Sequence, residues 1–152
     1  MNAPLKISRA ERTDICRIKP LLMKSELPVS DISLKLQEFW VAKADDELIG
    51  AVALERYNEN GIFRSFVVNE EYRNKKIGRA LHKIVIAEAR RYNLKSLYLL
   101  TTTAEKYFLK SGWINIDRTL VPEGIVKSQE FASICPQSAV CMEYKLEGPG
   151  GE

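Results

Sequence analysis

Residues 62–82 read IFRSFVVNEEYRNKKIGRALH, and the interpretation of the whole chain starts from this stretch. Its first part, Ile62 to Val68, is an apolar run of strand length that is rich in β-branched and aromatic residues. A short polar turn follows. From Ile77 onward, apolar residues recur with the three- and four-residue spacing of one helix face. The stretch therefore predicts a strand, a basic turn and an amphipathic helix over about residues 76–92.

The start of this predicted helix has features that favour anion binding. The first-turn amides of a helix have no intrahelical acceptor, and the helix dipole adds partial positive charge there. Gly78 would let a ligand approach the backbone closely, and Lys75, Lys76 and Arg79 add charge. The phosphate loops G-x-x-x-x-G-K-[ST] and G-x-G-x-x-G are both absent. By spacing alone, a basic and solvated helix start is an equally good interpretation.

The segment VVNEEYRNKKIGRAL resembles the acyl-CoA-binding motif R/Q-x-x-G-x-G/A of the GCN5-related N-acetyltransferases. Arg73 takes the Arg/Gln position and Gly78 the Gly/Ala position, whereas Lys76 stands where the family usually has its first glycine. The resemblance covers nearly the whole chain, because LYLLTTTAEKYFLKSGWINIDRT is similar to the family's next strand, helix and Gly-aromatic turn. With QEFASICPQSAVCM near the C-terminus, the chain is most similar to N-acetyltransferases encoded in arsenic-resistance gene clusters. It more distantly resembles the acetyltransferase domain of N-acetylglutamate synthases.

The resemblance implies an α/β (α+β) fold, with a mixed central sheet of about six or seven strands and helices on both faces. The sheet is expected to splay between its fourth and fifth strands, with the pantetheine arm of acetyl-CoA in the gap and the thioester between residues 62–68 and 96–101. The implied cofactor-binding residues come from the central strand, the basic turn and the later helix: Phe66, Val67, Val68, Arg73, Asn74, Lys75, Lys76, Ile77, Gly78, Arg79, Ala80 and Phe108.

Hydrophobic patterning predicts the other elements. Further strands are expected at residues 5–8, 38–44, 48–57, 96–101 and 138–146, with turns at 45–47 and 58–61. Thr13 or Asp14 could cap a first helix, which Pro20 would break or kink. Asp31 could start a second short helix through Leu36. Residues 121–133 are expected to form one or two short helices, which could be part of the wall of the acceptor site.

Length and composition favour one domain over residues 1–147, with a flexible tail at 148–152. The net charge of +3 is too small to predict a nucleic-acid partner. No apolar run is long enough to span a bilayer, the N-terminus lacks the apolar core of a signal peptide, and the three cysteines suit a reducing compartment, so a cytoplasmic location is expected. Cys135 and Cys141 have no chelating spacing, and no metal is predicted.

Two charged residues in the strands are candidates for the chemistry of amine acetylation. Glu55 lies late in an apolar strand and is a candidate base, although a strand-end carboxylate in water is about as good an interpretation. Arg64 interrupts the central strand, and a charge there needs a partner or a function. It could hold the carboxylate of an acceptor through a bidentate pair, or it could be a solvent-face arginine paired with a neighbouring carboxylate.

Further candidates lie in the second half of the chain. Thr101 and Thr102 end a strand and could bind the acceptor or pantetheine, or cap the helix that begins near Ala104. Many family members use a tyrosine as acid at the position of Phe108, so the usual acid is missing. Tyr107 precedes it and would point about 100° away on a helix. Catalysis without a dedicated acid is feasible, because a thiol has a pKa of about 8.5. The lone histidine, His82, is interpreted as structural or solvated.

The expected function is that of an acetyl-CoA-dependent N-acetyltransferase acting on a small amine, in particular an amino acid or an amino-acid-like compound. The subgroup resemblance makes an organoarsenical amino acid one conceivable acceptor and implies a role in arsenic resistance. The expected partners are acetyl-CoA and the acceptor, without nucleic acid or membrane, and a homodimer is one expected assembly. A non-catalytic acyl-CoA-binding or sensing domain and a protein N-acetyltransferase are the alternatives.

Overall fold

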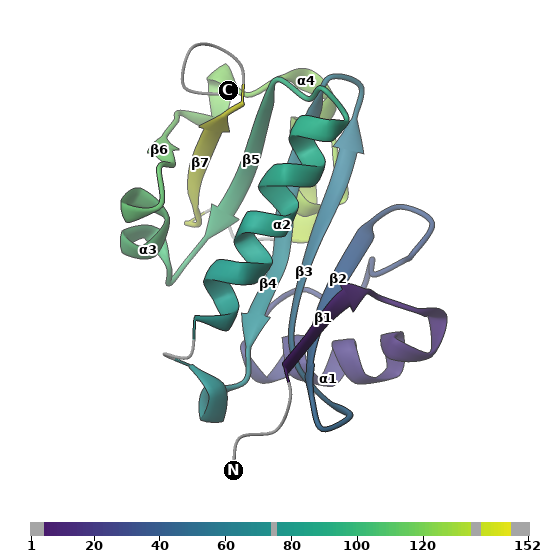
Figure 1. Ribbon diagram of the computed structural model, residues 1–152. Coiled ribbons are helices and arrows are strands. Elements are labelled where there is room, and N and C mark those ends of the chain that lie inside the picture. Colours follow the sequence, from purple (N-terminus) through teal and green to yellow (C-terminus); the bar gives the residue numbers. More distant parts are fainter. Residues whose placement is uncertain (1–4, 74–75, 135–137, 147–152) are drawn as a thin grey trace.

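The sheet at the centre of the molecule is mixed (Figure 1). The computed structural model describes residues 5–73, 76–134 and 138–146. The 7-stranded sheet has the order β1-β2-β3-β4-β5-β7-β6, in which β4 and β5 are parallel and the other neighbours are antiparallel. This confirms the predicted fold class. The strands are β1 (Leu5–Arg9), β2 (Glu38–Ala44), β3 (Glu47–Tyr57), β4 (Asn60–Val68), β5 (Ser96–Thr101), β6 (Ile114–Asn115) and β7 (Val140–Lys145).

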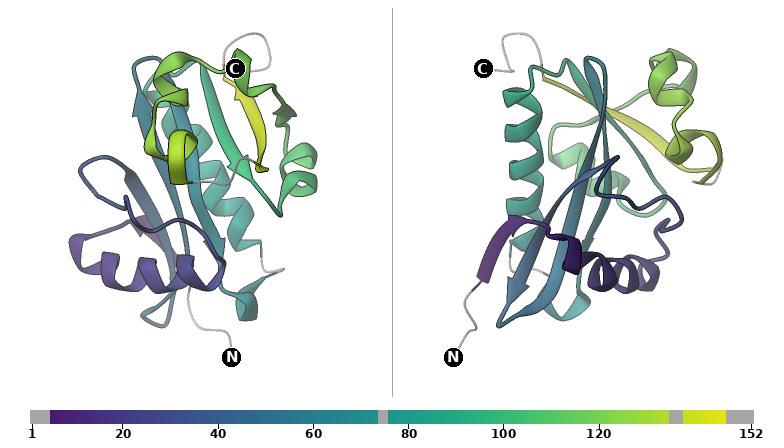
Figure 2. Two further views of the ribbon diagram at one scale, coloured as in Figure 1. Left: turned by 180° about the vertical axis from the view of Figure 1, so that it is seen from behind. Right: turned by 90° about the vertical axis from the view of Figure 1, so that its right-hand side faces the viewer.

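Helices cover both faces of the sheet (Figure 2). One face carries α2 (Ile77–Arg91), and Phe108 of α3 (Glu105–Lys110) packs into the same apolar cluster. The other face carries α1 (Ile15–Lys24), α4 (Glu123–Val126) and a π-helical turn (Glu130–Ile134). Short 3-10 turns lie at Arg12–Asp14, Glu70–Tyr72 and Arg118–Leu120. In the described parts of the chain, no helix combines the length and apolar character that crossing a membrane requires.

The predicted turns between the early strands are largely confirmed. Asp45 and Asp46 connect β2 to β3 with φ values of +52° and +67°, a left-handed conformation that aspartate tolerates better than most residues. The turn predicted at 58–61 is shorter than expected, since Tyr57 pairs with Asn60 and Gly61 already lies in β4. Gly61 packs closely in the sheet, since a Cβ atom there would come within 2.9 Å of the Leu54 side chain.

The helix predicted from Asp31 to Leu36 is wrong, because these residues form turns between α1 and β2. The buried side chain of Gln37 instead bonds to backbone groups of this segment. Its Oε1 accepts a hydrogen bond from the Ser33 amide (2.8 Å), and its Nε2 donates to the Asp31 carbonyl (3.1 Å). Of the break or kink predicted at Pro20, the break is absent, since α1 continues through this residue.

His82 is buried in the aromatic cluster beneath α2. Its side chain packs against Phe63 and Trp113, and the Trp113 indole N–H donates a hydrogen bond of 3.0 Å to His82 Nε2. Because Nε2 accepts this bond, the ring is neutral and carries its proton on Nδ1. Burial lowers the pKa of His82 from 6.5 to about 4. The structural interpretation of this residue is therefore confirmed.

The His82→Gln variant is expected to reduce the loss of stability in acid. Below pH 6.5 the unfolded chain protonates His82, whereas the folded chain resists protonation down to about 4. The contribution of His82 to the free energy of unfolding is thus fully present above pH 6.5 and decreases as the pH falls toward 4. At pH 4.5 the free energy of unfolding is expected to be lower by about 2 kcal/mol because of this residue. A glutamine oxygen could still accept the indole bond without titrating. Urea unfolding of both proteins at pH 7 and pH 4.5 measures the difference, and identical acid losses would contradict it.

Candidate functional site

The sheet opens between β4 and β5. Their parallel ladder joins Asn60–Ile62 to Ser96–Tyr98 and ends there, although β4 continues to Val68 and β5 to Thr101. Figure 1 shows the two arrowheads diverging beyond this point. The predicted splay between the fourth and fifth strands is confirmed. A strand edge that loses its neighbour exposes backbone donors and acceptors that an extended ligand can use.

A β-bulge shapes β4 at this opening. Ser65 and Phe66 lie together opposite Val52, and Ser65 has a left-handed φ of +56°, a costly conformation for a non-glycine residue. The extra residue resets the alternation of side chains. Phe66 therefore packs with Phe63 on the α2 face, while Val67 packs with α1 on the other face. The bulge thus places two aromatic rings on the same side of the opening.

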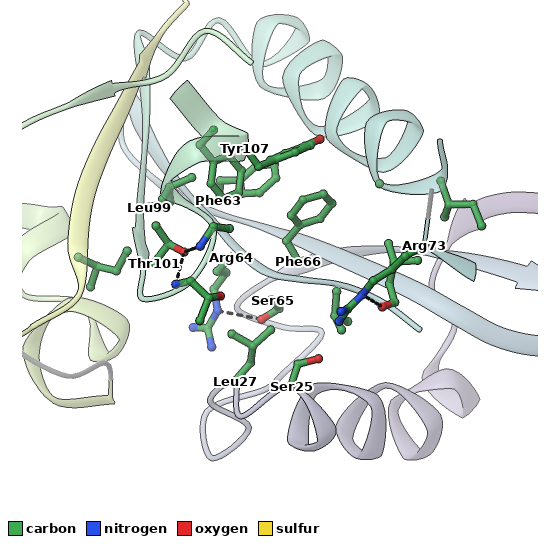
Figure 3. A pocket seen from close by; sticks show the side chains of 18 of the residues that line it. Ser25, Leu27, Phe63, Arg64, Ser65, Phe66, Arg73, Leu99, Thr101 and Tyr107 are labelled. Carbon is green, nitrogen blue, oxygen red and sulfur yellow. Dashed lines mark hydrogen bonds between the residues drawn. The ribbon is translucent and has the colours of Figure 1, made fainter. Parts of the chain in front are cut away.

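A cleft of about 760 Å³ fills the opening and extends from the start of α2 to Arg64 (Figure 3). Its walls come from β4, β5, the start of α2, the residues at and after the start of α3, and the segment after α1. Of the predicted cofactor-binding residues, those that line it are Phe66, Val67, Val68, Arg73, Lys76, Ile77, Gly78, Arg79 and Phe108. Ala80 is not among the lining residues, and Asn74 and Lys75 lie outside the described residues.

The start of α2 forms the basic end of the cleft. The first helical hydrogen bond runs from the Ala80 amide to the Lys76 carbonyl (3.2 Å), so the amides of residues 77–79 precede the helical ladder. Lys76 has a φ of +64°, a left-handed conformation that glycine adopts at no steric cost. Lys76, which stands at the position of the motif's first glycine, thus has a backbone conformation that would suit a glycine. A Cβ atom on Gly78 would lie 3.3 Å from the Phe66 ring and narrow the cleft.

Arg64 occupies the opposite end of the cleft, and its side chain is 0% exposed. Its two terminal nitrogens each donate a hydrogen bond of 2.6 Å to Asp31, a bidentate pair. Glu55 lies 3.1 Å and Glu130 3.4 Å from the same guanidinium. Burial lowers the pKa of Arg64, but the Asp31 bond and the charges of Glu130 and Glu55 raise it more, so Arg64 stays cationic. Of the alternative that Arg64 is a solvent-face arginine paired with a neighbouring carboxylate, the solvent exposure is wrong and the carboxylate pairing is confirmed, with Asp31 in the bidentate position.

Glu55 is buried, which excludes the interpretation of a strand-end carboxylate in water. Its oxygens accept hydrogen bonds from Gln37 Nε2 (2.9 Å), Arg64 Nη1 (3.1 Å) and the Tyr57 hydroxyl. Burial and the bond to Glu55 raise the pKa of Tyr57, which stays protonated at neutral pH. Glu55 is not among the residues that line the cleft, whereas Glu130 is. Its assignment as the base stays a prediction.

The predicted threonines have different surroundings. Thr101 lines the cleft, and its Oγ1 accepts a hydrogen bond from the Ala104 amide (3.0 Å), so it also caps the turn into α3. Thr102 is exposed and is not among the lining residues. The buried thiol of Cys141 lies on β7, where burial raises its pKa to about 11. Cys135 lies outside the described residues.

Two aromatic residues of α3 line the cleft wall. Phe108 is 3% exposed and packs edge-on against Phe63, so the position of the usual acid carries an apolar ring. Tyr107 also lines the cleft, although it is 36% exposed and lies on a different side of the helix from the buried Phe108. Figure 3 shows its hydroxyl directed toward α2 and away from Thr101. Burial raises the pKa of Tyr107, so it remains protonated.

Sequence reasoning did not identify Asp31, Glu130 or Gln37 as parts of this site. Asp31 was expected to begin a helix, and Glu130 lies in a segment expected only to form a wall of the acceptor site. Asp31 lies in no quoted motif, and Glu130 lies in the segment QEFASICPQSAVCM without any role assigned to it there. Both residues reach Arg64 through tertiary contact between distant segments. The sequence signal that was available was the unexplained charge of Arg64, which required a partner of opposite sign.

Comparison with known proteins agrees with this geometry. Residues 13–113 match the model of the Acetyltransferase (GNAT) family, and the chain belongs to this family. An amino-acid acetyltransferase of Shewanella oneidensis is 30% identical over 94 residues, which cover 60% of this chain but 21% of that protein. The chain thus spans about a fifth of the length of this curated relative.

Solved structures agree on the fold. N-acetylglutamate synthase from Neisseria gonorrhoeae, complexed with coenzyme A and N-acetyl-glutamate, superimposes with a TM-score of 0.81 at 20% identity, covering 97% of this chain and 36% of that one. A GNAT-family acetyltransferase from Staphylococcus aureus Mu50 gives a TM-score of 0.78 at 20% identity, covering 95% of this chain and 100% of that one.

The Gly78→Val variant is expected to weaken coenzyme A binding at least about tenfold, because the added side chain meets the Phe66 ring in the cleft. Calorimetric titration with coenzyme A measures the dissociation constant. Ala87→Val is the matched control, since Ala87 lies exposed on the same helix and does not line the cleft. Equal affinities for the two variants would mean that the ligand does not pass Gly78.

Proposed function

We propose that this chain transfers the acetyl group of acetyl-CoA to the amino group of a small molecule, an amino acid or an amino-acid-like compound. The cleft between β4 and β5 is the observation that carries this proposal, because it joins a helix start suited to a diphosphate to a buried guanidinium suited to a carboxylate. The relatives named as amino-acid acetyltransferases support the acceptor class. An organoarsenical amino acid belongs to this acceptor class, and its only support is the resemblance to N-acetyltransferases encoded in arsenic-resistance gene clusters.

In this proposal the donor enters with its diphosphate at the start of α2. The amides of residues 77–79 and the side chains of Arg73 and Lys76 bind the phosphate oxygens. The pantetheine arm follows the free edge of β4 at Phe66–Val68 and pairs with its backbone. The acetyl thioester then lies near Thr101, where β5 ends.

The reaction requires a neutral amine and a donor for the developing oxyanion. We assign the oxyanion donor to a backbone amide of β4 at the bulge, where the strand no longer pairs with β5. The thiolate of coenzyme A leaves without a dedicated acid, since Phe108 occupies the usual position of that acid and the Tyr107 hydroxyl is directed elsewhere. The proton returns to the thiolate from solvent.

Two carboxylates beside Arg64 are candidates for removal of the amine proton. Glu55 is the residue predicted from sequence, but it accepts three hydrogen bonds within the protein and does not line the cleft. Glu130 lines the cleft and lies at the same guanidinium. Because a base must come within hydrogen-bond reach of the amine, directly or through one water, we assign the proton transfer to Glu130 and a positioning role to Glu55.

Acetyl-CoA and a panel of L-amino acids, their decarboxylated amines and an organoarsenical amino acid test the proposed function. Thiol release above the rate without acceptor is expected for at least one amino acid, and mass spectrometry of the product should show one added acetyl group. Tight coenzyme A binding without turnover of any amine would favour a non-catalytic acyl-CoA-binding domain. Turnover of peptides alone would favour protein acetylation.

The Glu130→Gln variant is expected to lower kcat about a hundredfold with little change in the affinity for coenzyme A, because the amine loses its proton acceptor. Glu55→Gln keeps hydrogen-bond acceptance toward Arg64 and should lower kcat less than about tenfold. Steady-state kinetics on the best acceptor compare the two variants. The reverse order of effects would return the role of base to Glu55.

A further inference from the structure

The bidentate pair between Arg64 and Asp31 has the geometry that an acceptor carboxylate would need. A guanidinium presents parallel N–H donors that match the two oxygens of one carboxylate. In this structure both oxygens belong to Asp31, at 2.6 Å each. Arg64 is among the residues that line the cleft, and with Asp31 in place its side chain is 0% exposed. A ligand carboxylate can therefore gain this position if the Asp31 carboxylate vacates it.

Arg64 is held in place without the help of Asp31. Its Nε donates a hydrogen bond to Ser65 Oγ (3.2 Å), and Glu55 and Glu130 lie 3.1 Å and 3.4 Å from its terminal nitrogens. These partners come from β3, β4 and the π-helical turn, which are regular elements. The guanidinium therefore stays oriented and charge-compensated when the fourth partner changes.

Asp31, in contrast, belongs to a segment that contains turns instead of a helix or strand. The segment joins α1 to β2, and Ser25, Leu27 and Pro28 within it form part of the cleft wall. Figure 3 shows Ser25 and Leu27 on the same side of the cleft as Arg64. Segments held by few backbone hydrogen bonds open at a lower free-energy cost than the strands that support Arg64.

We propose that Asp31 determines acceptor specificity by occupying the carboxylate position of Arg64 in the free protein and giving it up to the carboxylate of the acceptor. This inference rests on the proposed function and adds a residue to it. The exchange replaces one carboxylate with another, so the charge around Arg64 does not change. A ligand carboxylate can accept both N–H donors that Asp31 leaves, because the guanidinium presents them in parallel to the two oxygens of one carboxylate, whereas a ligand without a carboxylate leaves these buried donors unsatisfied.

Asp31 is thus an intramolecular competitor for acceptors that carry a carboxylate. The apparent dissociation constant of such an acceptor is its intrinsic constant divided by the fraction of molecules in which Asp31 has left Arg64, so it is raised when Asp31 is bound in most molecules. An amine without a carboxylate meets no such competition and gains nothing when Asp31 is removed. The two kinds of acceptor should therefore respond differently to a change at this residue.

The Asp31→Asn variant tests this difference. It is expected to lower KM for the best amino-acid acceptor at least about fivefold and to leave KM for the corresponding decarboxylated amine within about twofold. Asp45→Asn is the matched control, since Asp45 is exposed in the β2–β3 turn and asparagine tolerates its left-handed φ. Asp31→Ser is a second variant without a carboxylate, should the first not fold.

A binding measurement separates this inference from the proposed function. The N-acetyl derivative of an amino acid carries the carboxylate but cannot react, so calorimetry on the coenzyme A-loaded protein gives its affinity without turnover. The dissociation constant is expected to fall at least about fivefold in Asp31→Asn, and hydrogen exchange at residues 31–37 of the wild type should increase on binding. Failure of the proposed function would appear as no turnover with any amine, whatever this measurement gives.

Two results would overturn the inference. If Asp31→Asn raises KM equally for the amino acid and for the decarboxylated amine, Asp31 only stabilises the cleft wall. An unchanged affinity for the N-acetyl derivative in both Asp31 variants would mean that acceptor carboxylates do not bind at Arg64.

Discussion

The end of the β4–β5 ladder after Ile62 and Tyr98 is the constraint on which the rest of the site depends. A buried sheet normally pairs its backbone groups, and a strand that diverges from its neighbour must satisfy them in another way. The bulge at Ser65 lies within this part of β4 and keeps both Phe63 and Phe66 on the α2 face. The parting of the strands therefore creates both a hydrogen-bonding edge and an apolar wall.

The buried charge of Arg64 organises the opposite face of the sheet. Two apolar clusters lie there, one around α1 and one around α4, and Arg64 belongs to neither. A buried guanidinium is tolerated only with compensating charge, which Asp31, Glu55 and Glu130 supply from three separate segments. The arginine thus joins the segment after α1, the sheet and the π-helical turn at one end of the cleft.

The two ends of the cleft differ in how far local sequence predicted them. The basic end follows from one continuous stretch, because a strand, a turn and a helix start lie next to each other along the chain. Lys76 departs from the glycine pattern but has a backbone conformation that would suit a glycine. At the Arg64 end, sequence reasoning named Arg64 and Glu55 but not the other two carboxylates. Asp31 was assigned to a helix, and Gln37, whose side chain bonds to backbone groups of that segment, was not recognised.

The sequence by itself determined the order and type of the main elements, the basic helix start, the position of Phe108 in place of a tyrosine, and the need for a partner to Arg64. These features depend on periodicity, on local backbone chemistry and on the resemblance of contiguous motifs. The tertiary structure alone decided which carboxylates surround Arg64, that Tyr107 shares the cleft wall with Phe108, and that Glu130 faces the cleft while Glu55 does not. These outcomes depend on how residues 31, 55, 64 and 130 pack together, and separation along a chain carries no information about such distances.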